Sequence, residues 1–185
     1  MAIEEPKFTV SLREGAFEIR DYGAAIAAEV IVTGDQKEAA RKGFRLLARY
    51  IFGGNTRNQS IAMTAPVAQA RISERIAMTA PVTQTPMDGA WVVRFTMPAS
   101  YTLETLPAPN DPNVKLRPIP PARFAVCRFS GLAIKATVEA KTVELMAFTK
   151  KHNLLTVGPT SLAQYNPPWT LWFMRRNEVM IALQS

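Results

Sequence analysis

The sequence has very few of the side chains that hold metals or carry nucleophilic catalysis. Its 185 residues include one cysteine, Cys127, and one histidine, His152. One cysteine excludes an intramolecular disulfide and any multi-cysteine site, and one histidine excludes a multi-histidine metal centre within one chain. The sequence also lacks a glycine-rich phosphate loop, a nucleophile elbow and any cluster with metal-ligand spacing. We therefore expect no protein metal site and no enzymatic activity.

Long apolar runs are missing as well. No stretch approaches the roughly 18 consecutive apolar residues that a membrane span needs. The start, Met1-Ala2-Ile3-Glu4-Glu5-Pro6, has acids where a signal or transit peptide would have bases. Because 48% of the residues are hydrophobic, the chain has enough apolar surface for one globular core. We expect a single cytoplasmic domain.

Acidic residues are absent from one long segment of this basic chain, whose formal net charge is +7. Residues 39–73 contain no carboxylate and six cations: Arg41, Lys42, Arg45, Arg49, Arg57 and Arg71. Such an imbalance could attract an anion, a nucleic acid or an acidic membrane surface. The simpler interpretation is the solvated face of one helix. Aromatic residues do not interleave these cations as in single-strand binders, so no specific nucleic acid is expected.

The hydrophobic periodicity predicts an α+β fold. Residues 36–52 read as a helix that begins after Asp35 and ends before Gly53-Gly54. Met87-Asp88-Gly89 reads as a hairpin turn, residues 98–121 as a proline-rich connection with a short strand at 114–119, and Gly158-Pro159 as a break. The second half repeats the order of elements of the first. The first half has strands at 8–12, 16–20, 24–32 and 91–97 in addition to its helix. The second half has a strand at 123–129, a helix at 133–152 and a closing strand or hairpin at 170–183.

A seven-residue motif occurs twice. Ile-Ala-Met-Thr-Ala-Pro-Val stands at residues 61–67 and again at 76–82. Two copies at so short a period do not make a solenoid. We predict two strands that lie near one another in the sheet, with Met63 and Met78 on comparable faces. Each proline would end its strand or lie on an exposed edge, because it cannot donate a backbone hydrogen bond.

Three kinds of side chain could hold a metal or react, and each has a simpler interpretation. His152 follows Lys150 and Lys151 at the predicted end of a helix, where cations interact favourably with exposed carbonyls. Cys127 alternates within a strand and is expected to be a small buried hydrophobe. The two motif methionines are expected to fill the core rather than to bind iron or copper.

Four segments together carry a family resemblance. They are Glu18-Ile19-Arg20-Asp21-Tyr22, the helix end Gly43 to Asn55, the repeated seven-residue motif, and Tyr165-Asn166-Pro167-Pro168-Trp169-Thr170 with Arg175-Arg176-Asn177-Glu178-Val179. In this order they resemble the SOUL family of haem-binding proteins, over about residues 5–182. The resemblance implies two β-α-β-β halves, residues 5–105 and 114–183, related by a pseudo-twofold. It implies a distorted antiparallel β-barrel with two flanking helices, similar to the bacterial effector-binding domains that hold a ligand in a groove between their halves.

The resemblance also implies binding of haem or a related tetrapyrrole by a carrier or buffer. Carried onto this sequence, the family's site comprises Arg41, Phe44, Arg45, Arg49 and Leu171. Phe44 and Leu171 would cover the macrocycle, and the arginines would neutralise its propionates. Leu171 stands where vertebrate members have a lysine, and no histidine lies near the first helix. Binding is therefore expected to be weak or to lack strong axial ligation.

Other functions remain open at this stage. The groove between the halves could hold another small apolar anion. A hydrolase would have to use Tyr22, Tyr165 or Glu178 as acid or base, and the first helix could bind polyanions without specificity. The sequence leaves the oligomeric state open.

Overall fold

The computed structural model describes residues 3–57, 73–166 and 169–184. The helices are α1 (Gln36–Ile51), α2 (Lys135–Lys151) and the short 3₁₀ helix η1 (Trp172–Met174). The strands are β1 (Phe8–Glu14), β2 (Phe17–Tyr22), β3 (Ala25–Thr33), β4 (Asn55–Thr56), β5 (Val82–Met87), β6 (Ala90–Thr96), β7 (Ala108–Pro109), β8 (Lys115–Ile119), β9 (Ala122–Ser130), β10 (Thr156–Gln164) and β11 (Arg176–Leu183). No helix in the described ranges is long and apolar enough to cross a membrane.

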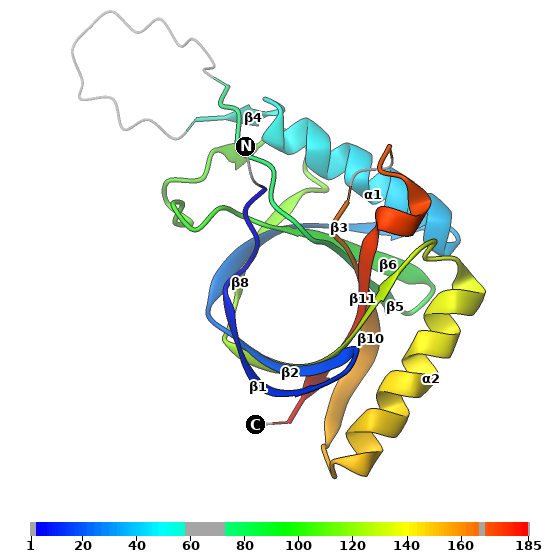
Figure 1. Ribbon diagram of the computed structural model, residues 1–185. Coiled ribbons are helices and arrows are strands. Elements are labelled where there is room, and N and C mark those ends of the chain that lie inside the picture. The colour runs from blue at the N-terminus through cyan, green and yellow to red at the C-terminus, as the bar shows by residue number, and fades with distance from the viewer. Residues whose placement is uncertain (1–2, 58–72, 167–168, 185) are drawn as a thin grey trace, which may run out of the picture.

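Nine of the strands form one antiparallel sheet in the order β1-β2-β9-β11-β10-β5-β6-β3-β8. The sheet curls strongly, and both helices lie on its outer side (Figure 1). The predicted α+β fold with two helices beside an antiparallel sheet is confirmed, but no pairing joins the two end strands within the described residues. The expected distorted β-barrel is therefore wrong, because the sheet is not closed. β8 contains Pro118, which has no N–H to donate and suits an edge strand. At the other end, the pairing of β1 with β2 shifts register between Val10 and Leu12.

Apart from β1, the strand order has the same pattern when it is followed from either end. β9, which precedes α2, pairs with β2, and β3, which precedes α1, pairs with β8. β10 and β5, the strands that follow the two helices, pair with each other. β2 of the first half and β8 of the second half are thus each hydrogen-bonded to a strand of the other half. The pseudo-twofold between residues 5–105 and 114–183 stays a prediction.

Each helix covers its own hydrophobic cluster. α1 begins as predicted, because Asp35 Oδ1 accepts a hydrogen bond from the Glu38 N–H at 2.8 Å. It buries Leu47, Tyr50 and Ile51 against β3 and β6. α2 packs on β9 and β11 and contributes Leu145, which is fully buried. The short strand predicted before residue 120 is β8, and the predicted turn at residues 87–89 joins β5 and β6.

The second copy of the repeated motif does not form the predicted strand. The first copy, residues 61–67, lies outside the described residues. In the second copy, only Val82 belongs to a strand, and Thr79 makes a single bridge with Glu4. The Ile76 N–H donates to the Ile51 carbonyl at 2.8 Å. The segment is irregular because its backbone bonds with the end of α1 and the N-terminal segment instead of with a neighbouring strand.

The predicted break at Gly158-Pro159 is also wrong. Both residues lie inside β10. The pairing of β10 with β11 shifts register between Val157 and Ser161. This irregularity accommodates a proline that cannot donate and a glycine at φ 68° without ending the strand.

Candidate ligand-binding cleft

A cleft of about 320 Å³ lies between α1, the second copy of the motif and the segment that joins β10 to β11. We call it the α1 cleft. The residues that α1 contributes are spaced by three and four, so they form one stripe on the first half of the helix; they are Lys37, Ala40, Arg41 and Phe44.

The surface of the α1 cleft is largely aromatic and aliphatic. Phe44 packs on Phe95 of β6, with their ring centroids 5.9 Å apart. Met78, from the second copy of the motif, lines the same wall and packs against the first cluster. On the opposite side stands Trp169, which is 79% exposed. The cleft therefore offers apolar surface on two sides.

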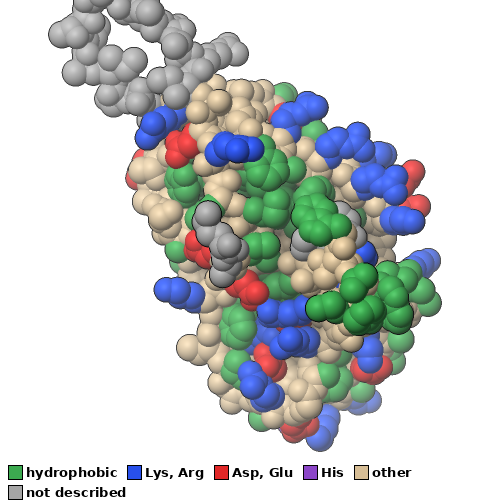
Figure 2. All heavy atoms as spheres, turned by 45° about the horizontal axis from the view of Figure 1, so that its top comes forward, with side chains coloured by type: hydrophobic (Ala, Val, Ile, Leu, Met, Phe, Trp, Pro, Cys, Tyr) green, Lys and Arg blue, Asp and Glu red, His purple; other side chains and the backbone are tan. Residues whose placement is uncertain are grey.

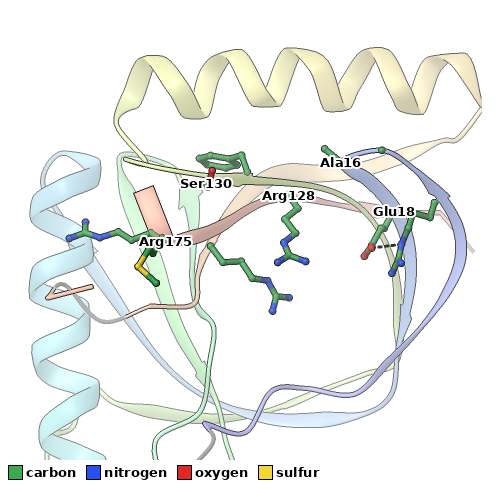
Figure 3. A pocket seen from close by; sticks show the side chains of 10 residues that line it. Ala16, Glu18, Arg128, Ser130 and Arg175 are labelled. Atoms are coloured by element: carbon green, nitrogen blue, oxygen red, sulfur yellow. Dashed lines mark ion pairs between the residues drawn. The ribbon is translucent and has the colours of Figure 1, made fainter. Parts of the chain in front are cut away.

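Cations surround this apolar surface. Lys37 and Arg41 come from α1, and Arg175 comes from the residue before β11. The Arg175 Nε donates to the Thr170 carbonyl at 2.9 Å; Figure 3 shows its side chain extending toward α1. None of the described residues that line the cleft is a carboxylate. Figure 2 shows Lys and Arg side chains around the hydrophobic surface of this face. The cleft is therefore suited to an apolar ligand with negative charge at its edge.

The structure brings together only two of the five residues in the predicted site. Arg41 and Phe44 line the α1 cleft, whereas Arg45 and Arg49 are exposed on α1 and do not line it. Arg49 lies eight residues after Arg41, or about 12 Å along a helix that rises 1.5 Å per residue. The cleft spans only the first half of α1. Leu171 is 58% exposed and also lies outside the lining.

Sequence reasoning missed Lys37, Trp169 and Arg175. A signal was present for the last two. Both belong to segments that carry the family resemblance, and the whole stretch from residue 145 to 177 contains no carboxylate. What the sequence could not show is that this stretch lies across from α1.

A buried ionic network lies next to the cleft. Glu178 is fully buried and accepts hydrogen bonds from Nη1 and Nη2 of Arg20, at 2.8 and 2.9 Å. The Tyr165 hydroxyl donates to the same carboxylate at 2.6 Å, and Arg176 Nη2 lies 3.0 Å from it. The Tyr22 hydroxyl accepts from Arg20 at 3.1 Å. The structure thus gathers all three residues that a hydrolase would have to use.

The protonation states of this network follow from its contacts. Burial opposes ionisation of Glu178, but hydrogen bonds from Arg20 and Tyr165 and the nearby arginine charges outweigh it and hold the pKa of this carboxyl below its ordinary value. Burial and the Glu178 charge raise the pKa of Tyr165. Glu178 is therefore an ionised group whose two oxygens are already paired.

A second cavity, of about 310 Å³, lies against the inner side of the sheet and has walls from both halves. We call it the inner groove. Several of its lining residues are aromatic or apolar, and one is a cation: Tyr22, Arg94, Phe124, Tyr165 and Met180. Tyr165 lines both the inner groove and the α1 cleft.

The single histidine and the single cysteine lie outside the α1 cleft. His152 caps the end of α2, as predicted, and its Nε2 lies 3.0 Å from Glu14 Oε1. Cys127 is fully buried, also as predicted, and burial raises its thiol pKa to about 11. Within the described residues, no three His, Cys, Asp or Glu side chains are grouped to hold a metal ion.

Sequence comparison identifies one family. The family model described as SOUL heme-binding protein matches residues 3–182, nearly the whole chain. No curated protein shows significant sequence similarity to the chain.

Solved structures share the fold at low sequence identity. The C-terminal domain of EcmrR has a TM-score of 0.63 and 9% identity, over 91% of this chain and 97% of that domain. A hydrolase from Listeria innocua has a TM-score of 0.58 and 13% identity, over 94% of both chains. SAV2435, whose structure contains tetraphenylphosphonium, has a TM-score of 0.50 and 11% identity, over 91% of this chain and 94% of its own. At these identities the likenesses show that the fold is shared.

Proposed function

Because the chain belongs to the SOUL heme-binding protein family, we propose that it binds haem or a related tetrapyrrole in the α1 cleft and acts as a cytoplasmic carrier or buffer. The observation that carries this proposal is a cleft with apolar walls and cations on two sides: Arg41 comes from α1 and Arg175 from the chain before β11.

The apolar walls suit a flat macrocycle. Phe44 and Met78 lie on one side and Trp169 on the other. Covering apolar ligand surface contributes roughly 25 cal/mol per Å² removed from water. Aromatic side chains also favour offset or edge contacts with a second ring system.

The cations suit the two carboxylates of such a ligand. Arginine recognises a carboxylate through two parallel hydrogen bonds, and charge-assisted bonds are the strong ones. Lys37 adds a third positive charge beside Arg41. No histidine lines the cleft, so we propose that affinity comes from the ring and its carboxylates, without strong axial ligation.

A haemin titration followed in the Soret region tests the proposal. Wild type should saturate at one haem per chain. Arg41→Glu with Arg175→Glu should weaken binding at least about tenfold, which corresponds to roughly 1.4 kcal/mol, because each lost contact contributes about that much on a partly open surface. Haem dimethyl ester lacks the negative charges, so it should bind wild type and variant alike.

The matched control is Arg45→Glu with Arg49→Glu, which makes the same charge change on the same helix outside the cleft. Neither side chain lines the cleft, and exposed charges are screened by salt, so this pair should lose clearly less affinity than the cleft pair. An equal loss in both pairs would instead put the ligand on the exposed face of α1. A wild type that binds no haem would contradict the proposal altogether.

The inner groove supports a second candidate function, the binding of another small apolar ligand as in an effector-binding module. One observation favours it: the groove has apolar and aromatic walls from both halves. Glu5, a carboxylate that lines the groove, is paired with Arg176, and the neighbouring Glu178 is paired with Arg20 and Arg176. We therefore propose a neutral or anionic ligand for this groove, rather than a cation.

Hydrolysis is the least supported function. Tyr22, Tyr165 and Glu178 are gathered in one network. However, Glu178 already accepts hydrogen bonds at both oxygens, and a general base needs a free acceptor within reach of its substrate. We propose that the protein is not an enzyme.

A further inference from the structure

A short loop exposes large apolar side chains beside the α1 cleft. We call residues 169–174 the aromatic loop. Five of its six side chains are large and apolar, and each is 56–79% exposed: Trp169, Leu171, Trp172, Phe173 and Met174. Figure 2 shows hydrophobic side chains protruding from this face of the molecule. Contiguous exposed apolar surface of this kind marks an interaction site.

The aromatic loop has more apolar surface than the α1 cleft uses. Only Trp169 lines that cleft, whereas Leu171, Trp172 and Phe173 line neither the cleft nor the inner groove. η1 holds Trp172 and Phe173 edge to face, with their ring centroids 5.7 Å apart. These three side chains therefore present a surface for something outside the molecule.

A cationic pocket of about 520 Å³ lies beside the base of the aromatic loop. We call it the arginine pocket. Four arginines, one carboxylate and Met174 of the aromatic loop are among the residues that line it; the charged ones are Arg13, Glu18, Arg128, Arg175 and Arg176. Figure 3 shows Arg128 projecting into the pocket and Glu18 in an ion pair at its side.

The positive charge of the arginine pocket is only partly compensated. Glu18 is already paired with Arg13 at 2.7 Å and with Arg20 at 2.6 Å. The Arg128 side chain has no hydrogen-bonding or ionic partner among the residues that the structure describes, and its backbone N–H donates to the Ala16 carbonyl. The pocket therefore offers a free guanidinium to an anion such as a phosphate group.

We propose that the aromatic loop and the arginine pocket together dock the protein on a bilayer that contains anionic phospholipid. Leu171, Trp172 and Phe173 would enter the boundary between headgroups and acyl chains, where amphipathic aromatic rings are stable. Arg128 would meet a lipid phosphate beside them. Cations next to inserted apolar side chains are the combination that anionic bilayers select.

Charge argues for a bilayer rather than a second copy of the chain. A twofold interface through the aromatic loop would bring identical surfaces together. The arginine pockets of both copies, each with Arg128 uncompensated, would then approach one another, and like charges at an interface oppose association. A protruding loop of six residues is also small against the roughly 800 Å² that each partner buries in a stable interface.

Vesicle flotation without added haem tests the proposal independently of the proposed function. Wild type should float with vesicles of phosphatidylcholine and phosphatidylglycerol, and much less with phosphatidylcholine alone. Raising the salt should reduce flotation, because attraction to the surface falls within a Debye length. Inorganic phosphate that supplies the same total charge as the anionic lipid should not release the protein, because the lipid also holds the aromatic loop.

Two variants and their controls locate the docking surface. Trp172→Ser with Phe173→Ser should lower the vesicle partition coefficient at least about tenfold. The control is Val143→Ser with Leu155→Ser. These side chains are 70% and 69% exposed, on α2 and just before β10, and their substitution should leave the partition coefficient unchanged. Arg128→Glu should reduce partitioning more than Lys115→Glu, which makes the same charge change on the exposed edge strand β8.

Three results would overturn the proposal. One is a wild type that does not float with anionic vesicles. Another is equal flotation of wild type and the Trp172 and Phe173 variant. The third is concentration-dependent self-association in sedimentation velocity that this variant abolishes, which would make a second copy the partner. All these substitutions are on exposed side chains, and circular dichroism should confirm that each variant remains folded.

Discussion

Glu178 is the residue at which burial and charge conflict most strongly. It is fully exposed in the unfolded chain and fully buried in the fold, where Arg20 and Tyr165 occupy its oxygens. Removing one partner of such a pair leaves an uncompensated buried charge. The network therefore makes the fold sensitive both to substitution and to acid.

Glu178→Gln should lower the free energy of unfolding, by up to about 3–5 kcal/mol at neutral pH, because the buried Arg20 guanidinium loses one of its two carboxylate partners and keeps only Glu18. Urea denaturation measures this. Glu139→Gln, at a carboxylate whose side chain is 65% exposed, is the matched control and should change little. If Glu178→Gln is as stable as wild type in urea, Arg20 is sufficiently compensated without the Glu178 charge.

The same substitution should alter the acid response. The pKa of Glu178 is lower in the fold than in the unfolded chain, so its ionised form stabilises the fold above an unfolded pKa of about 4.3. That stabilisation is lost as pH falls through the folded pKa. The stability difference between wild type and Glu178→Gln should therefore shrink below about pH 4. A difference that stays constant on acidification would contradict this.

His152 should have no part in ligand binding. It caps α2 beside Glu14 and does not line the α1 cleft. His152→Ala should leave any haem absorption spectrum nearly unchanged. In the haemin titration, Arg41→Glu should instead saturate at a higher haemin concentration than wild type. Loss of the Soret band in a folded His152→Ala protein would identify an axial ligand from the second half.

At the scale of elements, the approach of α1 to the sheet depends on one glycine. A Cβ on Gly43 would lie 2.6 Å from the Val93 Cβ of β6. Only a residue without a side chain permits this contact. The close approach in turn sets how far Phe44, the next residue, stands above β6 in the α1 cleft.

Gly43→Ala should lower the free energy of unfolding by about 1–3 kcal/mol. This loss would occur although alanine is more favourable than glycine in a helix by about 1 kcal/mol. Thermal denaturation measures the change. The reason is the clash with Val93, so the effect of adding Val93→Ala should be less than additive. A stabilised Gly43→Ala protein would mean that helix propensity outweighs packing at this position.

The whole molecule should unfold as one unit. The two larger hydrophobic clusters of the described residues are covered by different helices, but β2 pairs with β9 and β8 pairs with β3. Each half is therefore completed by a strand of the other. Neither half is expected to remain folded when the other is destabilised.

Leu145→Ala tests this cooperativity. The substitution removes a fully buried side chain of α2 and should cost about 2–5 kcal/mol. Trp91 packs against the other cluster. In a Trp169→Phe, Trp172→Phe background, its fluorescence should report the same lowered midpoint as far-UV circular dichroism. A Trp91 transition that stays at the wild-type midpoint would indicate two independent units.

Local chemistry made several features predictable from the sequence. Asp35 and the spacing of apolar residues define the start and the buried face of α1, and Asp88-Gly89 defines a hairpin. The motifs that carry the family resemblance were sufficient for the family, which the match over residues 3–182 confirms. These features depend on residues near one another in the chain, where propensity and pattern act directly.

Long-range contacts decided the rest. Pairing of Glu178 with Arg20 joins residues 158 positions apart, and Arg175 lines a cleft with Arg41 because β10 and β11 deliver it opposite α1. The second copy of the motif has a strand-like sequence, yet residues 76–81 bond with α1 and the N-terminal segment. Backbone groups bond with whichever partner the tertiary structure brings within reach. The family, the start of α1 and the cations along this helix can therefore be predicted from residues close together in the chain. Which of these cations face an apolar cleft depends on contacts between distant segments.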